Sequence, residues 1–262
     1  MQCIALASGS KGNCLYVEGE SSSLLVDAGL TRREVLTRLH AAGKAADSIT
    51  AILVTHEHID HIAAVMPLAR HLAVPVYATG GTLVDLLDSG RVHRDPVRAV
   101  RVDYGEDFCV GEFSVRAFAV SHDAREPCGF TIRDEDLTLG CCTDTGMVTD
   151  HMVENLSRCD GLVLESNHCP QMLKEGPYPE SLKRRIRSRR GHLSNDGAAE
   201  CINGLCTQVH SILLAHLSEV NNTPAKALAS ARQAAGLFSS GLEIGVATNM
   251  GSGGGWPHGI HL

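Results

Sequence analysis

The sequence predicts an α/β (α+β) fold in which two β-sheets pack against each other and helices cover their outer faces. Short apolar segments of strand length come in runs, and segments with helical periodicity separate the runs. Hydrophobic residues make up 44% of the 262 residues, which is enough for one sizeable core. No proline- or glycine-rich linker divides the chain. We therefore expect one domain over residues 1–250 and a flexible glycine-rich tail at 251–262.

The first half of the chain is expected to be rich in strands. The apolar runs 14–17 and 23–26 flank a turn at Gly19, which is the pattern of paired strands. Leucine and valine then recur at helical spacing over 31–42, and Gly43 follows as a stop signal. Further elements are expected as strands at 52–55, 75–78 and 113–120, a helix at 62–72, and a hairpin of 130–132 with 137–142.

Helices in the second half carry recognisable start signals. Ser194 can cap a helix that runs to about residue 205, and Thr223 followed by Pro224 can begin one that runs to 235. The segment 179–189 is predicted to be a basic helix. The other elements expected here are a helix at 149–158 and strands at 162–165, 211–215 and 244–247.

Composition excludes several classes of protein. The formal net charge of −7 argues against a protein that coats nucleic acid with its whole surface, although a nuclease with a local basic patch is allowed. The ten cysteines form no CxxC pair, and the N-terminus lacks the charged and apolar regions of a signal peptide. No apolar run reaches the ~18 residues of a membrane span. We expect a cytoplasmic protein with reduced thiols and no membrane contact.

The densest signal for chemistry is a histidine-rich loop directly after the expected strand at 52–55. His56, His58, Asp60 and His61 lie within six residues. Imidazole and carboxylate are ligands that suit Zn²⁺, Mn²⁺ or Fe²⁺. Buried without a metal, groups that titrate near neutrality would pack against one another at a cost in free energy. We therefore prefer a metal site to the alternative, a solvated histidine-rich loop.

The spacing His56-x-His58-x-Asp60-His61 resembles the signature of the metallo-β-lactamase superfamily. The resemblance implies a four-layer αββα sandwich with its site at the strand ends. It also implies two divalent metal ions per chain, with Asp27 supporting the ligands from behind. The implied ligands are His56, His58 and His122 for the first metal, Asp60, His61 and His216 for the second, and Asp144 between the two. A single histidine at a strand end is more often structural, but agreement at every position favours an enzyme.

Four further segments resemble the YycJ/WalJ-type group of this superfamily, whose members are regarded as 5′→3′ DNA exonucleases. The segments are 8–14, 165–168, 191–195 and 216–222. This resemblance covers essentially the whole chain. The separation between Asp144 and His192 is too short for the inserted β-CASP domain of related ribonucleases. The implied function is a dinuclear-metal-dependent phosphodiesterase that acts on nucleic acid, with DNA favoured and RNA also compatible.

A basic stretch lies immediately before His192. Lysine and arginine contact phosphates without reading the base sequence. We expect phosphate contacts from Arg184, Arg185, Arg187, His192 and Ser194. The alternative for the basic stretch is a solvated helix face.

Three residues are assigned catalytic roles as hypotheses. Asp60 would hold the second metal and accept the proton of the attacking water. His192 would donate to a phosphate oxygen, and His168 is the second choice for proton donation to the leaving group. Each of these two histidines has the alternative of a hydrogen-bonded structural residue.

Three other functions compete with the exonuclease. A ribonuclease of the RNase Z or RNase J kind is the closest rival, because both substrates present the same phosphodiester. A glyoxalase II-like thioester hydrolase shares the metal loop but does not need the basic stretch. A non-catalytic module that binds nucleic-acid ends is disfavoured by the complete ligand set. Metal identity, digestion polarity and oligomeric state are open at this point.

Overall fold

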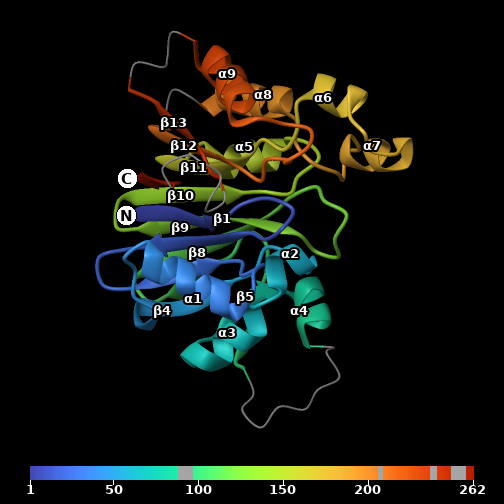
Figure 1. Cartoon of the computed structure of the whole chain (residues 1–262). Helices are drawn as coiled ribbons and strands as arrows, with labels where there is room; N and C mark the ends of the chain where they lie inside the picture. Colours follow the sequence, from blue (N-terminus) through green and yellow to red (C-terminus); the bar gives the residue numbers. More distant parts are fainter. Residues whose placement is uncertain (88–96, 206–208, 237–240, 249–257) are drawn as a thin grey trace.

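The computed structural model describes residues 1–87, 97–205, 209–236, 241–248 and 258–262. Within these residues two seven-stranded sheets lie face to face, and helices cover the outer face of each (Figure 1). The four-layer αββα sandwich predicted from the sequence is therefore confirmed. No helix in the described part of the chain is long and apolar enough to cross a membrane.

The first sheet contains the N-terminal strands, which pair antiparallel at first and then parallel. In spatial order it consists of β14 (His258–His261), β1 (Gln2–Ala7), β2 (Cys14–Glu18), β3 (Ser23–Val26), β4 (Ile49–Leu53), β5 (Val76–Thr79) and β6 (Ala99–Val102). Sequence alternation does not predict β1, because five of its six side chains are buried, whichever face they point to.

The C-terminal end departs from the expected flexible tail. Residues 251–257 lie outside the described part, but β14 pairs antiparallel with β1, and Ile260 is buried opposite Cys3. One buried isoleucine in a strand of four is too short a pattern to read from a single sequence. The prediction of a tail is therefore wrong for 258–261.

The second sheet holds the remaining strands. In spatial order it consists of β13 (Glu243–Val246), β12 (Ser211–Ala215), β11 (Gly161–Glu165), β10 (Leu137–Cys142), β9 (Cys128–Asp134), β8 (Phe113–Ala119) and β7 (Asp107–Val110). The predicted hairpin is confirmed as β9 and β10. Because β10, β11 and β12 run parallel, their carboxyl ends meet at one edge of the sheet.

The helices flank the two sheets, and their starts follow the predicted capping. Thr31 and Glu34 form a reciprocal capping box, and the Thr223 side chain accepts a hydrogen bond from Lys226 N. Beside the first sheet lie α1 (Arg32–Ala41), the 3₁₀ helix η1 (Ala46–Ser48), α2 (Ile59–Ile62), α3 (Val65–Leu72) and α4 (Gly80–Leu87). Beside the second lie α5 (Asp150–Leu156), α6 (Pro170–Glu175), α7 (Glu180–Ile186), α8 (Asn195–Leu205) and α9 (Pro224–Ala235).

Two helix predictions need correction. The segment expected as one helix at 62–72 is two helices, and α2 already begins at Ile59 inside the histidine-rich loop. The basic helix expected at 179–189 ends at Ile186. The arginines after it therefore lie in a turn that leads to His192.

Three apolar clusters fill the spaces between the layers. The central one packs β-strands of both sheets through residues such as Val17 and Leu24 of the first sheet and Phe130 of the second, and the others lie between each sheet and its helices. The nine described cysteines are free, and burial raises the pKa of most of their thiols. Buried thiols with a raised pKa are typically unreactive.

Candidate metal centre

The site forms where the carboxyl ends of strands from both sheets meet. Asp27 follows β3, Asp144 lies just beyond β10 and His216 follows β12. All three have a left-handed backbone, with φ of 62°, 56° and 56°. Such a conformation is uncommon in residues other than glycine and costs free energy. The chain bends sharply at each of these points, and the three side chains turn toward a common centre.

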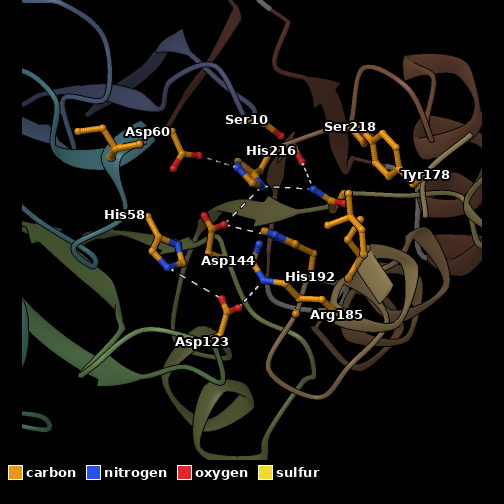
Figure 2. Close-up of a pocket in the computed structure, with 15 residues that line it drawn as sticks. Ser10, His58, Asp60, Asp123, Asp144, Tyr178, Arg185, His192, His216 and Ser218 are labelled. Atoms are coloured by element: carbon orange, nitrogen blue, oxygen red, sulfur yellow. Dashed lines mark hydrogen bonds and ion pairs between the residues drawn. The ribbon is translucent and has the colours of Figure 1, made fainter. Parts of the chain in front are cut away.

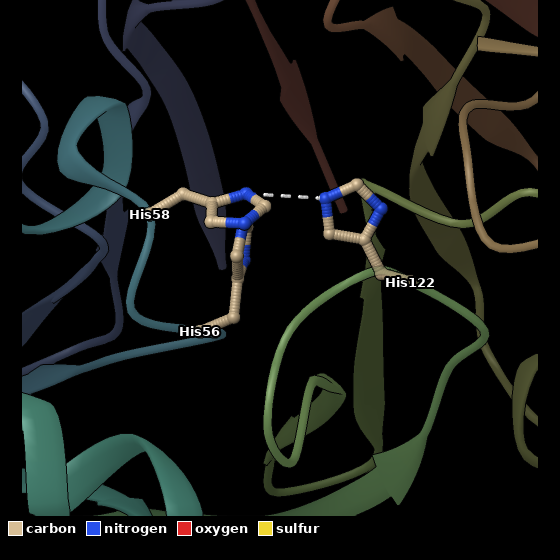
Figure 3. A group of neighbouring side chains, drawn as sticks. All are labelled: His56, His58 and His122. Atoms are coloured by element: carbon tan, nitrogen blue, oxygen red, sulfur yellow. Dashed lines mark hydrogen bonds between the residues drawn. The ribbon is translucent and has the colours of Figure 1, made fainter. Parts of the chain in front are cut away.

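The first group of candidate ligands consists of three histidines (Figure 3). His56 and His58 come from the loop after β4, and His122 comes from the segment after β8. His122 Nε2 lies 3.3 Å from His58 Nδ1, and one ring nitrogen of each residue lies within 4.8 Å of the others. Three imidazoles at this spacing can hold one cation.

The second group lies beside the first and shares a carboxylate with it. Asp60, His61 and His216 place ligand atoms within 4.8 Å of one another, as do His56, His61 and Asp144. Asp144 Oδ2 lies 3.2 Å from His61 Nε2, and Asp144 Oδ1 lies 3.5 Å from His216 Nδ1. In Figure 2 Asp144 lies between His58, a member of the first group, and His216, a member of the second.

Hydrogen bonds orient the ligand histidines. His61 Nδ1 lies 2.8 Å from Asp27 Oδ2, and His122 Nδ1 lies 2.9 Å from the carbonyl oxygen of Gly191. Carboxylate and carbonyl oxygens only accept, so each imidazole donates from Nδ1, and its Nε2 is directed toward the centre. Asp27 also accepts from the amide and hydroxyl of Thr55, so it lies where the sequence resemblance placed it.

Glu165, at the end of β11, is a buried hydrogen-bond acceptor behind the histidines of the second sheet, as Asp27 is behind His61. Its fully buried carboxylate lies 2.8 Å from His192 Nδ1 and 3.3 Å from His216 Nδ1, and it accepts the amide of Thr145. No role for Glu165 was assigned from the sequence. The available signal was a glutamate that ends the apolar run 162–165, where a buried strand makes an unpaired charge costly.

The charges at the centre shift the pKa of several groups. Burial by itself would lower the pKa of His216, but Asp144, Asp60 and Glu165 outweigh it and raise that pKa to about 10. Burial likewise opposes the shift at Asp144, yet His216 and His61 hold its pKa well below the usual range. For His56 burial dominates, with help from His61, and its pKa is well below the usual range. A cation that binds here displaces protons from the histidines that carry them.

The donor atoms fit divalent cations. Three buried polar atoms at the centre have no hydrogen-bond partner, namely His56 Nε2, Asp144 Oδ2 and His216 Nε2. Buried polar atoms are normally paired, so such a cluster requires an explanation. Imidazole nitrogens and a carboxylate oxygen directed at one space are the ligand set of transition-metal cations.

The glycine-containing turn near the N-terminus braces the centre. Asn13 Nδ2 lies 2.9 Å from His61 Nε2, and the amide of His216 donates to Ser8 Oγ. A side chain at Gly29 would collide with the backbone of Asp60, which a Cβ would approach to 1.6 Å. Glycine at this position therefore allows the ligand loop to lie against the turn.

A cavity of about 290 Å³ opens over the metal centre (Figure 2). Its floor includes His58, Asp60, Asp144 and His216, and its wall includes His192 and residues of α7. Arg185 Nε donates to Asp123 Oδ2 across this cavity at 2.6 Å, and Asp123 Oδ1 lies 3.4 Å from His122 Nε2. Asp123 was not singled out from the sequence, although it directly follows His122.

The predicted phosphate contacts divide into three sets. Arg185 and His192 line the cavity over the metal centre. Arg187 and Ser194 instead line a neighbouring cavity of about 400 Å³, where Ser194 Oγ accepts the amide of Gly197 at the start of α8. Arg184 is exposed on α7 and belongs to neither set of lining residues.

His168 lies in the neighbouring cavity, behind His192, and is not among the residues that line the cavity over the metal centre. Burial lowers its pKa to about 4. A neutral imidazole in this place does not suit the predicted role of proton donor to the leaving group.

Comparison with known proteins agrees with this geometry. A family model described as the Beta-lactamase superfamily domain matches residues 23–217. The chain is 38% identical to the exodeoxyribonuclease WalJ of Streptococcus pneumoniae, over 92% of this chain and 90% of that protein. It is 39% identical to the exodeoxyribonuclease YycJ of Bacillus anthracis, over 92% and 91% of the two chains.

Among solved structures, the metallo-β-lactamase fold protein YhfI of Bacillus subtilis superposes with a TM-score of 0.75. The match covers 99% of both chains at 17% identity, so it shows only that the fold is the same. The family model covers well over half of the chain, and the two curated relatives align over nearly its whole length. The chain therefore belongs to the metallo-β-lactamase superfamily and, within it, to the WalJ/YycJ-like group.

Proposed function

We propose that this protein is a metal-dependent DNA exonuclease that hydrolyses phosphodiester bonds in the 5′→3′ direction. The observation that carries the proposal is the pair of candidate ligand groups around Asp144 beneath a cavity that Arg185 and His192 line. The names of the WalJ and YycJ relatives support DNA as the substrate.

The centre would hold two divalent cations, with Zn²⁺ or Mn²⁺ preferred and Fe²⁺ compatible. Their ligands are proposed to be those predicted from the sequence, three histidines on one side of Asp144 and Asp60, His61 and His216 on the other. Bound there, such cations act as Lewis acids toward a phosphate oxygen and make water an effective nucleophile at neutral pH.

The protein's own residues then bind and orient the substrate. Arg185 contacts a phosphate beside the centre, because its guanidinium already faces an oxygen anion there. His192, held at Nδ1 by Glu165, donates from its other nitrogen to a phosphate oxygen. Asp60 is partly exposed to the cavity and its pKa is lowered: burial opposes the shift, but the neighbouring imidazoles of His216, 3.8 Å away, and His61 outweigh it. It is therefore ionised and accepts the proton of the attacking water.

The test is a panel of end-labelled substrates. Purified protein is given single- and double-stranded DNA and RNA, with 5′-phosphate or 5′-hydroxyl ends, in Mn²⁺, Zn²⁺ or EDTA. We expect mononucleotides to be released from the 5′ end of DNA, and EDTA to stop the release. Preference for RNA, or hydrolysis of a thioester with no action on nucleic acid, would contradict the proposal.

Replacement of His192 by alanine should slow turnover about 100-fold and leave the bound metal unchanged. A positioned proton donor contributes on this order, and His192 is proposed to contact phosphate and not metal. Turnover is measured by nucleotide release and metal content by mass spectrometry. His210→Ala, which removes an exposed histidine at the start of β12, is the matched control. Loss of metal in His192→Ala would show that His192 is a ligand.

Replacement of Arg185 by alanine should weaken DNA binding about tenfold at moderate salt and reduce the slope of log K against log salt by about one. Arg185 lines the cavity, whereas its neighbour Arg184 does not. Arg184→Ala is therefore a control with the same change in net charge. Fluorescence anisotropy at several salt concentrations measures both. Equal losses in the two variants would mean that the helix acts only through its overall charge.

A further inference from the structure

The mouth of the cavity over the metal centre carries apolar side chains that the ligand set does not explain. Ile59 lies between two candidate ligands in the chain, and its side chain is 73% exposed, more than any other large hydrophobic residue described. Tyr178 and Leu182 line the same cavity from the side of α7. In Figure 2 Tyr178 lies on the opposite side of the cavity from His58 and Asp60. Apolar surface at the rim of a polar site indicates contact with a ligand.

The backbone at Tyr178 is restricted by its neighbours in the sequence. Pro177 and Pro179 flank it, and each proline fixes its own φ and restricts the residue before it. The segment also packs closely against the loop that follows His216, because a Cβ at Gly176 would approach Asn221 Oδ1 to 2.3 Å. The backbone that carries the ring is therefore restricted, which lowers the conformational cost of using Tyr178 as a binding platform.

We propose that Tyr178, with Ile59 across the cavity mouth, holds the base of one unpaired nucleotide next to the phosphate that is cleaved. This inference rests on the proposed function. A phosphate at the centre can be contacted by Arg185, and the attached nucleoside then reaches the rim that Tyr178 and Ile59 form. Aromatic rings bind bases of any sequence because every base has a π-face, so the site suits successive removal of different nucleotides.

The same geometry should favour single-stranded DNA ends over duplex ends. A base at a blunt duplex end is paired at its edge and stacked on its neighbour, so it must unpair before it can be the unpaired base that lies on Tyr178. Single-stranded DNA has no such requirement. The protein is therefore expected to prefer single-stranded ends to blunt duplex ends.

The experiment compares oligonucleotides that carry an abasic nucleotide at the first, second or third position from the 5′ end. For the wild type, an abasic nucleotide at one of these positions should lower kcat/KM about tenfold, which is the scale of one stacked base. Tyr178→Phe should keep this discrimination, and Tyr178→Ala should lose it. Ile59→Ala should reduce it, whereas Val84→Ala, an exposed apolar residue on α4 outside the cavity, should leave it unchanged.

Two results would overturn the inference: equal rates of the wild type on abasic and normal DNA, or undiminished discrimination in Tyr178→Ala. If the wild type hydrolyses no DNA at all, the proposed function fails, and binding alone decides the inference. For that case an oligonucleotide with 2-aminopurine at its end is added in EDTA. Its fluorescence should be quenched more by the wild type and Tyr178→Phe than by Tyr178→Ala, and equal quenching would count against stacking.

Discussion

Replacement of Asp144 by alanine should reduce hydrolysis at least about 1,000-fold and leave little metal bound. The carboxylate is buried, and its two oxygens lie between His61 on one side and His192 and His216 on the other. Because Asp144 is proposed to serve both metals, its loss should remove a donor from each proposed site. No other carboxylate of the centre occupies that place.

The measurement combines metal content with single-turnover hydrolysis under saturating Mn²⁺ or Zn²⁺. Asp136→Ala, at the exposed turn between β9 and β10, is the control for loss of one negative charge. Thermal unfolding shows whether the variant is folded. A folded Asp144→Ala protein with wild-type rate or a full complement of metal would refute the place given to Asp144.

Replacement of Glu165 by glutamine should lower both metal affinity and stability. The amide has the shape of the carboxylate but turns one of its acceptors into a donor toward His192, His216 or the amide of Thr145. Loss of a residue that hydrogen-bonds a metal ligand typically lowers metal affinity about 10- to 100-fold. Loss of one partner of a buried charge pair costs about 3 kcal/mol in unfolding free energy.

Isothermal titration with Zn²⁺ and urea unfolding of the metal-free protein measure the two effects separately. Glu154→Gln, an exposed residue on α5, is the control and should change neither. A fall in stability with unchanged metal affinity would make Glu165 a structural residue only. The comparison matters because no role for Glu165 was predicted from the sequence.

The fold could be predicted from the sequence where pattern and turn chemistry agree. The hairpin β9–β10 alternates and has an acidic turn, and α1 and α9 carry their caps in the sequence. Strands β1 and β14 could not be predicted, because β1 is buried along almost its whole length and β14 depends on pairing with the other end of the chain. Long-range pairing leaves no local signal in four residues.

The site was predictable to the extent that its residues cluster or end strands. The loop His56 to His61 is dense, and His122, Asp144 and His216 fall at the ends of apolar runs. The positions of Tyr178 and Asp123 at the cavity could not be predicted from the sequence. They depend on which elements face the cavity, and this is a property of packing and not of residue spacing. Arg184 and Arg185 are neighbours in the sequence, and only the fold shows which of the two lines the site.

The most direct test of the metal centre is a crystal structure of the protein grown with Mn²⁺ or Zn²⁺, with anomalous data collected above and below the metal absorption edge. We expect two anomalous peaks. One should lie about 2.0–2.2 Å from nitrogens of His56, His58 and His122, the other at that distance from donors of Asp60, His61 and His216, with Asp144 in contact with both. A fully metal-loaded protein with its peaks away from these side chains, or with the side chains turned apart, would contradict this centre.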